Sequence, residues 1–226
     1  MNTEFRPASD QSLLVRFDQN ISPETHRRVR SLLHLLATEP IAGVLNLHPA
    51  YCSVLVDFNA LKLSHAEIEA VLQHYVSRLD EVHFPLPKDI EIPTCYGGKY
   101  GPDLNEVASL HGISPDQAIQ LHSSVAYTVY FLGFVPGFAY LGELPEMLRT
   151  PRLKVPRRTT PAGSVGIADN QTGVYPFAAP AGWRVIGRTP LGMFRPDRAN
   201  MNLNSVGDRV RFVPISTAEF SALHEA

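Results

Sequence analysis

The segment from Phe131 to Pro196 constrains the fold of this chain more than any other. It holds 9 of the 19 prolines and 9 of the 15 glycines within 66 residues. Glycine adopts backbone conformations that other residues avoid, and proline fixes one backbone angle, so this density predicts many tight, shaped turns. Such loops on a rigid sheet commonly carry binding or catalytic groups. A β-barrel that simply needs turns would show the same density, so both interpretations stay open.

The N-terminal part alternates between strand and helix patterns. Ser22-Pro23 and Ser64 each begin a helix, because serine caps exposed backbone N–H groups and proline fits the first helical position. Strand patterns lie at 13–17, 43–47, 53–58 and 89–93. The order β-α-β-β-α-β is typical of a ferredoxin-like α/β sandwich.

Pro85-Leu-Pro87 is the predicted linker between two domains. The strand that begins at Asp89 follows it directly and could belong to either side. We place the boundary so that residues 1–86 form the ferredoxin-like domain and residues 87–226 form the second domain.

The second domain reads as a β-barrel, which makes the whole chain α+β. Two short helices with capping-box patterns begin at Asp103 and Ser114. An alternating strand at 125–131 then leads into the turn-rich segment, and a last strand covers 209–213. Many short strands separated by glycine and proline turns favour a closed or nearly closed barrel.

Composition excludes several classes of function. The net charge is −2 and no basic run exists, which argues against nucleic acid or an anionic membrane as the main partner. No run approaches the roughly 20 apolar residues that span a bilayer, and the N-terminus lacks an apolar signal core. Cys52 and Cys95 have no metal spacing and read as reduced thiols of a cytoplasmic protein. Neither histidines nor carboxylates show a metal pattern, so no metal site is predicted.

Two short motifs are similar to known phosphate-binding or catalytic loops but do not have the required spacing. Gly97-Gly-Lys-Tyr-Gly101 lacks the spacing that wraps phosphates in a P-loop, so a turn before the Asp103 helix is the better interpretation. Gly163-Ser-Val-Gly166 is one residue too short for a nucleophile elbow. The catalytic residues therefore stay unassigned.

Several side chains are candidates for binding. Arginine recognises carboxylates with two parallel hydrogen bonds, which favours Arg188 as an anchor and makes Arg152 a second candidate, although surface solvation would also explain both. His122 ends a helix as either a general base or a capping residue. Flat apolar surface with polar tips is supplied by Tyr140, Gln171, Tyr175 and Trp183. For Trp183, core packing and an interface contact are equally open.

Taken in order, the motifs of residues 96–214 resemble one family. It includes the B subunit of bacterial 5-oxoprolinase, the sporulation kinase inhibitor, and the first half of the carboxyltransferase part of urea carboxylase (allophanate hydrolase subunit 1). The motifs are Tyr96-Gly-Gly-Lys-Tyr-Gly-Pro-Asp-Leu104, Leu121-His-Ser-Ser124, Phe131-Leu-Gly-Phe-Val-Pro-Gly-Phe-Ala-Tyr-Leu-Gly142, Pro151-Arg-Leu, Pro161-Ala-Gly-Ser-Val-Gly-Ile, Gln171-Thr-Gly-Val-Tyr-Pro176 and Ile186-Gly-Arg-Thr-Pro190. Asp169 stands where glycine is usual, and Ala181 stands in a Pro-Gly-Gly-Trp-like turn.

The resemblance implies a cyclophilin-like barrel in residues 87–226. It also implies that the chain is the B subunit of an ATP-dependent 5-oxoprolinase complex, which hydrolyses 5-oxo-L-proline to L-glutamate only with its partners. The C subunit would bind directly and the A subunit would complete the complex, with ATP and Mg used at the level of the whole assembly. In such a composite site Arg188 would anchor the substrate, with Tyr140, Gln171 and Tyr175 around it. The alternative is a regulatory protein that inhibits a sensor histidine kinase through its barrel.

Overall fold

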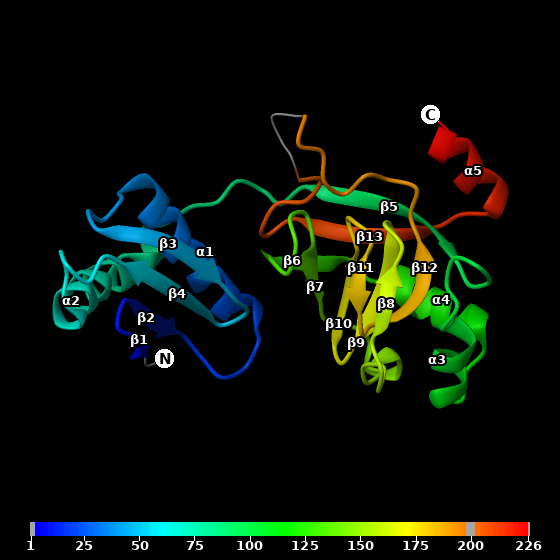
Figure 1. Cartoon of the computed structure of the whole chain (residues 1–226), viewed down its shortest axis with the longest axis horizontal. Coiled ribbons are helices and arrows are strands. Elements are labelled where there is room, and N and C mark those ends of the chain that lie inside the picture. Colours follow the sequence, from blue (N-terminus) through cyan, green and yellow to red (C-terminus); the bar gives the residue numbers. More distant parts are fainter. Residues whose placement is uncertain (1–2, 198–201, 226) are drawn as a thin grey trace. The chain divides into compact units, whose positions relative to one another are not determined.

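The computed structural model describes residues 3–197 and 202–225 of the protein (Figure 1). Contacts between residues divide the chain into two compact units, Met1–Leu86 and Pro87–Ala226. Each unit has its own hydrophobic core, and both combine helices with sheet, so the chain is α+β.

The first unit is a four-stranded antiparallel sheet with two helices. Its strand order is β1-β2-β4-β3. The elements are β1 (Glu4–Ser9), β2 (Ser12–Arg16), α1 (Pro23–Thr38), β3 (Val44–Pro49), β4 (Ser53–Phe58), α2 (His65–Ser77) and the 3-10 turn η1 (Leu79–Glu81). In β4 every second side chain is buried, namely Val54, Val56 and Phe58. These side chains form one core with the apolar stripes of both helices, which is why the sheet alternates and the helices are amphipathic.

Both predicted helix starts in this unit are confirmed. The Ser22 hydroxyl accepts a hydrogen bond from the backbone N–H of Thr25, and Pro23 occupies the first turn. Ser64 forms a capping box with Glu67, in which each side chain accepts from the backbone of the other residue.

The Asp89 strand, which the sequence left open to either side of the linker, belongs to the second unit. The strand β5 (Asp89–Tyr96) pairs with strands of the second unit, and β1 supplies the fourth strand of the first sheet instead. Most side chains of β1 are exposed, and its sequence contains Arg6 and Pro7. An edge strand held mainly by backbone pairing with β2 has no hydrophobic alternation to reveal it.

The second unit is built on a closed seven-stranded barrel in the order β10-β7-β6-β13-β5-β12-β9, with β9 also paired to β10. The barrel strands are β5, β6 (Tyr127–Leu132), β7 (Ala139–Gly142), β9 (Ser164–Ala168), β10 (Gln171–Val174), β12 (Arg184–Arg188) and β13 (Arg209–Pro214). All pairs are antiparallel except β13 with β5. The other elements are α3 (Leu104–Leu110), α4 (Pro115–Ser123), η2 (Glu146–Leu148), α5 (Thr217–Glu225) and a small sheet of β8 (Arg157–Thr160) with β11 (Ala179–Ala181).

The Gly97-to-Gly101 segment is a turn, as its motif analysis predicted, and the structure shows that it packs against β12. The backbone N–H of Gly97 donates to the carbonyl of Ile186. A side chain at Gly101 would place its Cβ 1.9 Å from that same carbonyl oxygen. The glycine is therefore required by close approach of two backbones, a structural demand unrelated to phosphate binding.

We expect limited proteolysis to cut first within Pro85–Asp89. All five residues are exposed, Leu86 is 92% exposed, and residues 82–88 belong to no helix or strand. Exposed segments between cores are the preferred sites of nicking. A low dose of a protease with broad specificity, followed by mass spectrometry of the fragments, checks this. Fragments whose ends lie only elsewhere, with 85–89 intact, would contradict it.

Candidate functional site

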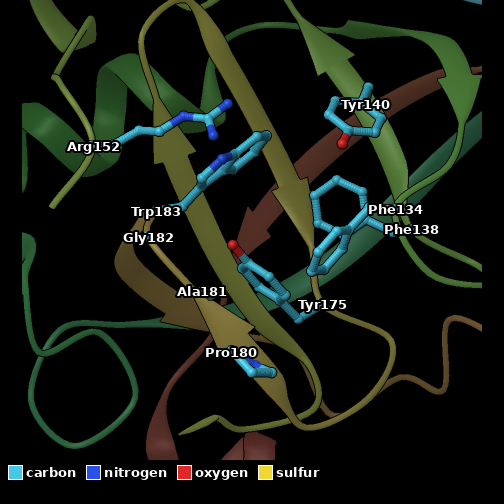
Figure 2. Close-up of a pocket in the computed structure, with 9 residues that line it drawn as sticks. All are labelled: Phe134, Phe138, Tyr140, Arg152, Tyr175, Pro180, Ala181, Gly182 and Trp183. Atoms are coloured by element: carbon cyan, nitrogen blue, oxygen red, sulfur yellow. The ribbon is translucent and has the colours of Figure 1, made fainter. Parts of the chain in front are cut away.

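The second unit contains a cavity of about 110 Å³ that is walled by aromatic rings, here called the aromatic pocket (Figure 2). Its lining residues are Phe134, Phe138, Tyr140, Arg152, Tyr175, Pro180, Ala181, Gly182 and Trp183. They come from the β6–β7 hairpin, from the segment between η2 and β8, and from the stretch that runs from the end of β10 through β11 to β12. Three turn-rich segments of the chain therefore meet at one place.

Phe138 is the centre of the aromatic cluster. Its ring centroid lies 5.0 Å from that of Tyr140 and 5.3 Å from that of Tyr175. The Trp183 ring lies 5.5 Å away at a steep angle of 78°. Tilted and edge-to-face pairs of this kind are each worth about 0.5–1.5 kcal/mol beyond their buried area. Phe138, Tyr175 and Trp183 are almost fully buried, so the wall is formed before any ligand arrives.

Two glycines of the barrel make room for these rings. A Cβ at Gly173 would lie 2.9 Å from the Ala139 carbonyl oxygen and 2.9 Å from the end of the Phe138 ring. A Cβ at Gly166 would lie 3.2 Å from both Tyr175 and Trp183. The rings thus pack directly on the barrel backbone, and larger residues at these positions would displace them.

The Trp183 side of the pocket is held by a buried carboxylate. Asp103 is 5% exposed, and its two oxygens accept from the backbone N–H of Val185 at 2.6 Å and from the Arg157 guanidinium. Arg157 also donates to the Trp183 carbonyl at 3.5 Å. The predicted capping box at Asp103 is wrong, because its side chain makes no cap hydrogen bond with α3. The carboxylate instead joins the start of α3 to β12 and β8.

Arg152 is the only charged residue among those that line the aromatic pocket. Its Nε lies 3.7 Å from the Asp169 carboxylate, and both side chains are more than half exposed. An exposed ion pair at this distance contributes about 0–1 kcal/mol. The carboxylate of a ligand can therefore take the place of Asp169 beside Arg152 at little cost. Figure 2 shows the guanidinium next to the Trp183 ring.

The two tyrosines of the pocket are protonated at neutral pH. Burial raises the pKa of Tyr175 to about 12, and burial also raises the pKa of Tyr140. Desolvation favours the neutral form of a phenol, so each hydroxyl can donate a hydrogen bond and neither acts as a ready base. The pocket therefore combines apolar walls, neutral donors and one cation.

The predicted candidates divide into two groups. Tyr140, Tyr175, Trp183 and Arg152 meet in the aromatic pocket. Gln171, Arg188 and His122 are not among its lining residues.

Two of the residues outside the pocket lie at strand ends. Gln171 begins β10 opposite Gly142 and Ala168. Arg188 ends β12, where its Nε donates to the Ala162 carbonyl at 2.8 Å.

Sequence reasoning missed Phe134 and Phe138, although both lie in the motif Gly133-Phe-Val-Pro-Gly-Phe. Phenylalanine in apolar surroundings reads as core, and only the glycines and the proline around it mark an exposed hairpin. Two aromatic residues within a tight turn are the signal that could have located this wall.

His122, near the end of α4, has no exposed surface and packs against the rings of Tyr127 and Phe212 from barrel strands. Thr172 donates to the Gly166 carbonyl, so its hydroxyl oxygen accepts from His122 Nε2 at 2.9 Å. The Tyr96 hydroxyl then donates to Nδ1 at 2.7 Å. This chain of bonds satisfies a neutral imidazole with its proton on Nε2. Desolvation lowers the pKa of His122 to about 3, consistent with that neutral form.

Comparison with known proteins identifies the family. Residues 3–204 match the family model described as carboxyltransferase domain, subdomain C and D. The chain belongs to this family. It is 38% identical to the B subunit of 5-oxoprolinase from Bacillus subtilis, covering 96% of this chain and 94% of that protein. For the Haemophilus influenzae B subunit the identity is 39%, with 92% and 95% covered, and for the Escherichia coli O157:H7 B subunit it is 58%, with 58% and 60% covered. The predicted resemblance is thereby confirmed.

Solved structures agree on the fold. The protein TTHA0988 is 35% identical with a TM-score of 0.80, and this chain, matched over 91% of its length, spans 40% of that chain. A conserved protein from Pyrococcus horikoshii is 45% identical with a TM-score of 0.58, covering 96% of this chain and 100% of that one. Urea carboxylase of Kluyveromyces lactis has a TM-score of 0.79 at 19% identity, covering 99% of this chain and 22% of that chain, which is a likeness of fold alone.

Within residues 3–197 and 202–225, no group of three or more His, Cys, Asp or Glu residues is placed to hold a metal ion. In the same residues, no helix has the length and apolar character needed to cross a bilayer.

We expect acid to destabilise the barrel unit through His122. The folded state keeps this imidazole neutral down to a pKa of about 3, whereas the unfolded chain binds the proton near pH 6.5. The contribution of neutral His122 to the free energy of unfolding is complete above pH 6.5. It is lost as the pH falls below 6.5, by up to about 1.4 kcal/mol per pH unit. Denaturant unfolding followed by the fluorescence of Trp183, the only tryptophan, measures it.

His122→Gln is the control for this pH dependence. It should be less stable at pH 7, because Tyr96 and Thr172 lose a matched partner, but its stability should be nearly constant from pH 6.5 to about pH 5. The lowered pKa values of Asp57, Glu67 and Glu219 act at more acidic pH and should affect both proteins alike. Parallel curves for the two proteins in this window would show that His122 is not the cause.

Proposed function

We propose that this chain is the B subunit of an ATP-dependent 5-oxoprolinase, which opens the lactam of 5-oxo-L-proline to give L-glutamate. The observation that carries this proposal is its similarity to proteins named as the B subunit of 5-oxoprolinase. Two of them match more than 90% of both chains at 38% and 39% identity. The alternative, inhibition of a sensor histidine kinase, gains no support from these relatives.

The chemistry explains why such an enzyme would need several polypeptides and ATP. An unstrained lactam is a poor electrophile, and its nitrogen is a poor leaving group. Phosphorylation of the carbonyl oxygen would lower that barrier. This sequence has no P-loop spacing, so the ATP and Mg site would lie in the complex assembled with the C subunit, the direct partner, together with the A subunit. This chain would contribute recognition of the substrate, and such a complex would work in the cytoplasm.

The aromatic pocket supports a small planar acid as the ligand. A five-membered lactam ring has flat faces that fit between aromatic walls, and its carboxylate needs a cation. Arg152 is the cation at this pocket, and its planar fork matches a carboxylate. Tyr140 and Tyr175 can donate to the lactam oxygen. A second arrangement, in which Arg188 and Gln171 contact the substrate, would require a site outside this pocket.

We infer a cyclophilin-like class for the barrel and a ferredoxin-like class for the first unit. The closed barrel and the α+β composition support the first inference. Two helices on a four-stranded sheet support the second, with β1 in place of the strand that a β-α-β-β-α-β order would add.

The isolated chain should show no 5-oxoprolinase turnover. The phosphate site and the catalytic groups would come from its partners, so activity should appear only when both the A and the C subunits have been added. The assay is 5-oxo-L-proline-dependent release of phosphate and glutamate by the purified chain alone, with each partner separately, and with both partners together. Robust turnover by the chain alone would refute the assignment of a composite site.

Arg152→Lys should weaken 5-oxo-L-proline use by the assembled complex. Lysine keeps the charge but loses the fork, at a cost of about 1.5–3 kcal/mol in kcat/KM, or roughly 10- to 150-fold. Arg188→Lys is the matched comparison, because it changes the same chemistry outside the pocket. It should alter thermal stability through its bond to Ala162 and leave kcat/KM within about threefold.

The comparison distinguishes two placements of the substrate. A defect confined to Arg152→Lys supports the aromatic pocket. A kinetic defect confined to Arg188→Lys, in a complex that assembles and melts normally, would place the substrate carboxylate at the end of β12 instead.

A further inference from the structure

The tip of the β6–β7 hairpin has a strained backbone at Phe134. Its φ is 67°, in the left-handed region that bulky side chains avoid. The N–H of Val135 donates to the carbonyl of Gly133 at 2.8 Å, which closes a three-residue γ-turn around Phe134. A γ-turn with positive φ at its centre is rare and strained. Such outliers persist where surrounding structure enforces them, and they concentrate at ligand sites.

The base of the hairpin is fixed. Gly133 and Phe138 pair through a backbone hydrogen bond of 3.1 Å, and the N–H of Phe138 donates to the Val135 carbonyl. A Cβ at Gly137 would lie 2.6 Å from Cβ of Phe194, so that segment packs closely against the turn. The conformation of Phe134 is thus imposed by its neighbours.

The strained turn places one ring at the mouth of the aromatic pocket. The Phe134 ring meets the Phe138 ring edge-on at 5.6 Å and the Tyr175 ring edge-on at 6.4 Å. It is nevertheless 58% exposed, whereas Phe138, Tyr175 and Trp183 are each 5% exposed or less. Figure 2 shows Phe134 beside Phe138 on the wall opposite Arg152. A large apolar ring held in water by a strained backbone has a surface available for a ligand.

We propose that Phe134 is a specificity-determining residue whose ring covers the flat face of 5-oxo-L-proline while Arg152 holds the carboxylate. The inference rests on the proposed function, and it assigns the ring contact to a residue that the sequence did not single out. A planar lactam would complete the wall that is open at this position. An open-chain acid has no flat ring to cover, so Phe134 would favour cyclic over open-chain acids.

Trp183 provides a direct test, because the chain's only tryptophan lines the same pocket. Titration of the full chain with 5-oxo-L-proline should change its fluorescence. Phe134→Leu should raise the Kd about fivefold, the size of one lost aromatic contact, and Phe134→Tyr should restore it to within twofold. Phe177→Leu is the matched control, since Phe177 is also exposed but contacts Phe194 outside the pocket. It should bind as the wild type does.

Phe134→Gly separates the ring from the backbone. Glycine adopts positive φ without steric cost, so the Tm should stay within about 3 °C of the wild type. Its Kd should rise at least as much as that of the leucine variant. If this variant unfolds, the leucine and tyrosine variants still decide the question. In the assembled complex KM for 5-oxo-L-proline should rise with kcat nearly unchanged, while open-chain L-glutamine inhibits all variants equally weakly.

Three results would overturn the proposal. The first is no fluorescence response of the wild type, and the second is a Kd within twofold of the wild type for both Phe134→Leu and Phe134→Gly. The third is a loss of activity in the Phe134 variants that is traced to failed assembly of the complex. The proposed function fails by a different result, namely the absence of 5-oxo-L-proline-dependent ATP hydrolysis by the wild-type complex.

Discussion

The candidate site depends on two positions where the barrel has no side chain. Strand residues alternate between the two faces of a sheet, and β9 buries Val165 and Ile167 in the barrel core. Gly166 lies between them and faces the other way, against Tyr175 and Trp183. Gly173 plays the same part on β10. Because nothing projects there, a second, aromatic core of Phe138, Tyr175 and Trp183 can rest on the barrel wall. The pocket is the space that this second core leaves open.

The inner face of the barrel wall carries a polar group within the apolar core. Thr172 of β10 bonds there to the buried His122 of α4, and Tyr96 completes a fully bonded, neutral set. Satisfied polar networks of this kind fix a single packing arrangement, whereas a partly satisfied one would be costly. The inner face thus contributes rigidity, and the outer face carries the aromatic pocket. The adjacent residues Thr172 and Gly173 lie on these two faces: Thr172 bonds to His122 on the inner face, and Gly173 lies against Phe138 on the outer face.

Sequence patterns predicted what depends on local chemistry. The helix starts at Ser22 and Ser64, the turn at Gly97 and the barrel itself follow from caps, glycines and alternation. The patterns failed where a strand or a side chain depends on a distant partner. The strand β1 is mostly exposed and is held mainly by backbone pairing with β2. Asp103 has the spacing of a cap, yet its carboxylate is drawn to Arg157 and to the N–H of Val185.

The candidate site shows the same contrast between what local sequence determines and what depends on distant partners. The sequence singled out aromatic rings and arginines, and the aromatic pocket is lined by such a set, but spacing alone could not show that Arg152, and not Arg188, lies there. That choice depends on how the segment between η2 and β8 folds back toward the β9–β10 turn. A bridge between Thr150 and Asp169 sets that path, and it joins positions far apart in the chain. Asp169 itself adopts a φ of 52°, so the position that departs from the family's usual glycine keeps a glycine-like backbone.

The parallel pairing of β5 with β13 has a consequence for how the barrel forms. These are the first and last strands of the barrel in sequence, and they pair along six residues, from Asp89 with Arg209 to Thr94 with Pro214. Contacts between such distant segments form slowly, because a long loop must close first. During synthesis the barrel would stay open until β13 emerges, with the edges of β5 and β6 unpaired. Unpaired edges invite intermolecular pairing. Pairing of β13 is therefore the step that closes the barrel. The newly made chain is most prone to aggregate just before this strand has paired.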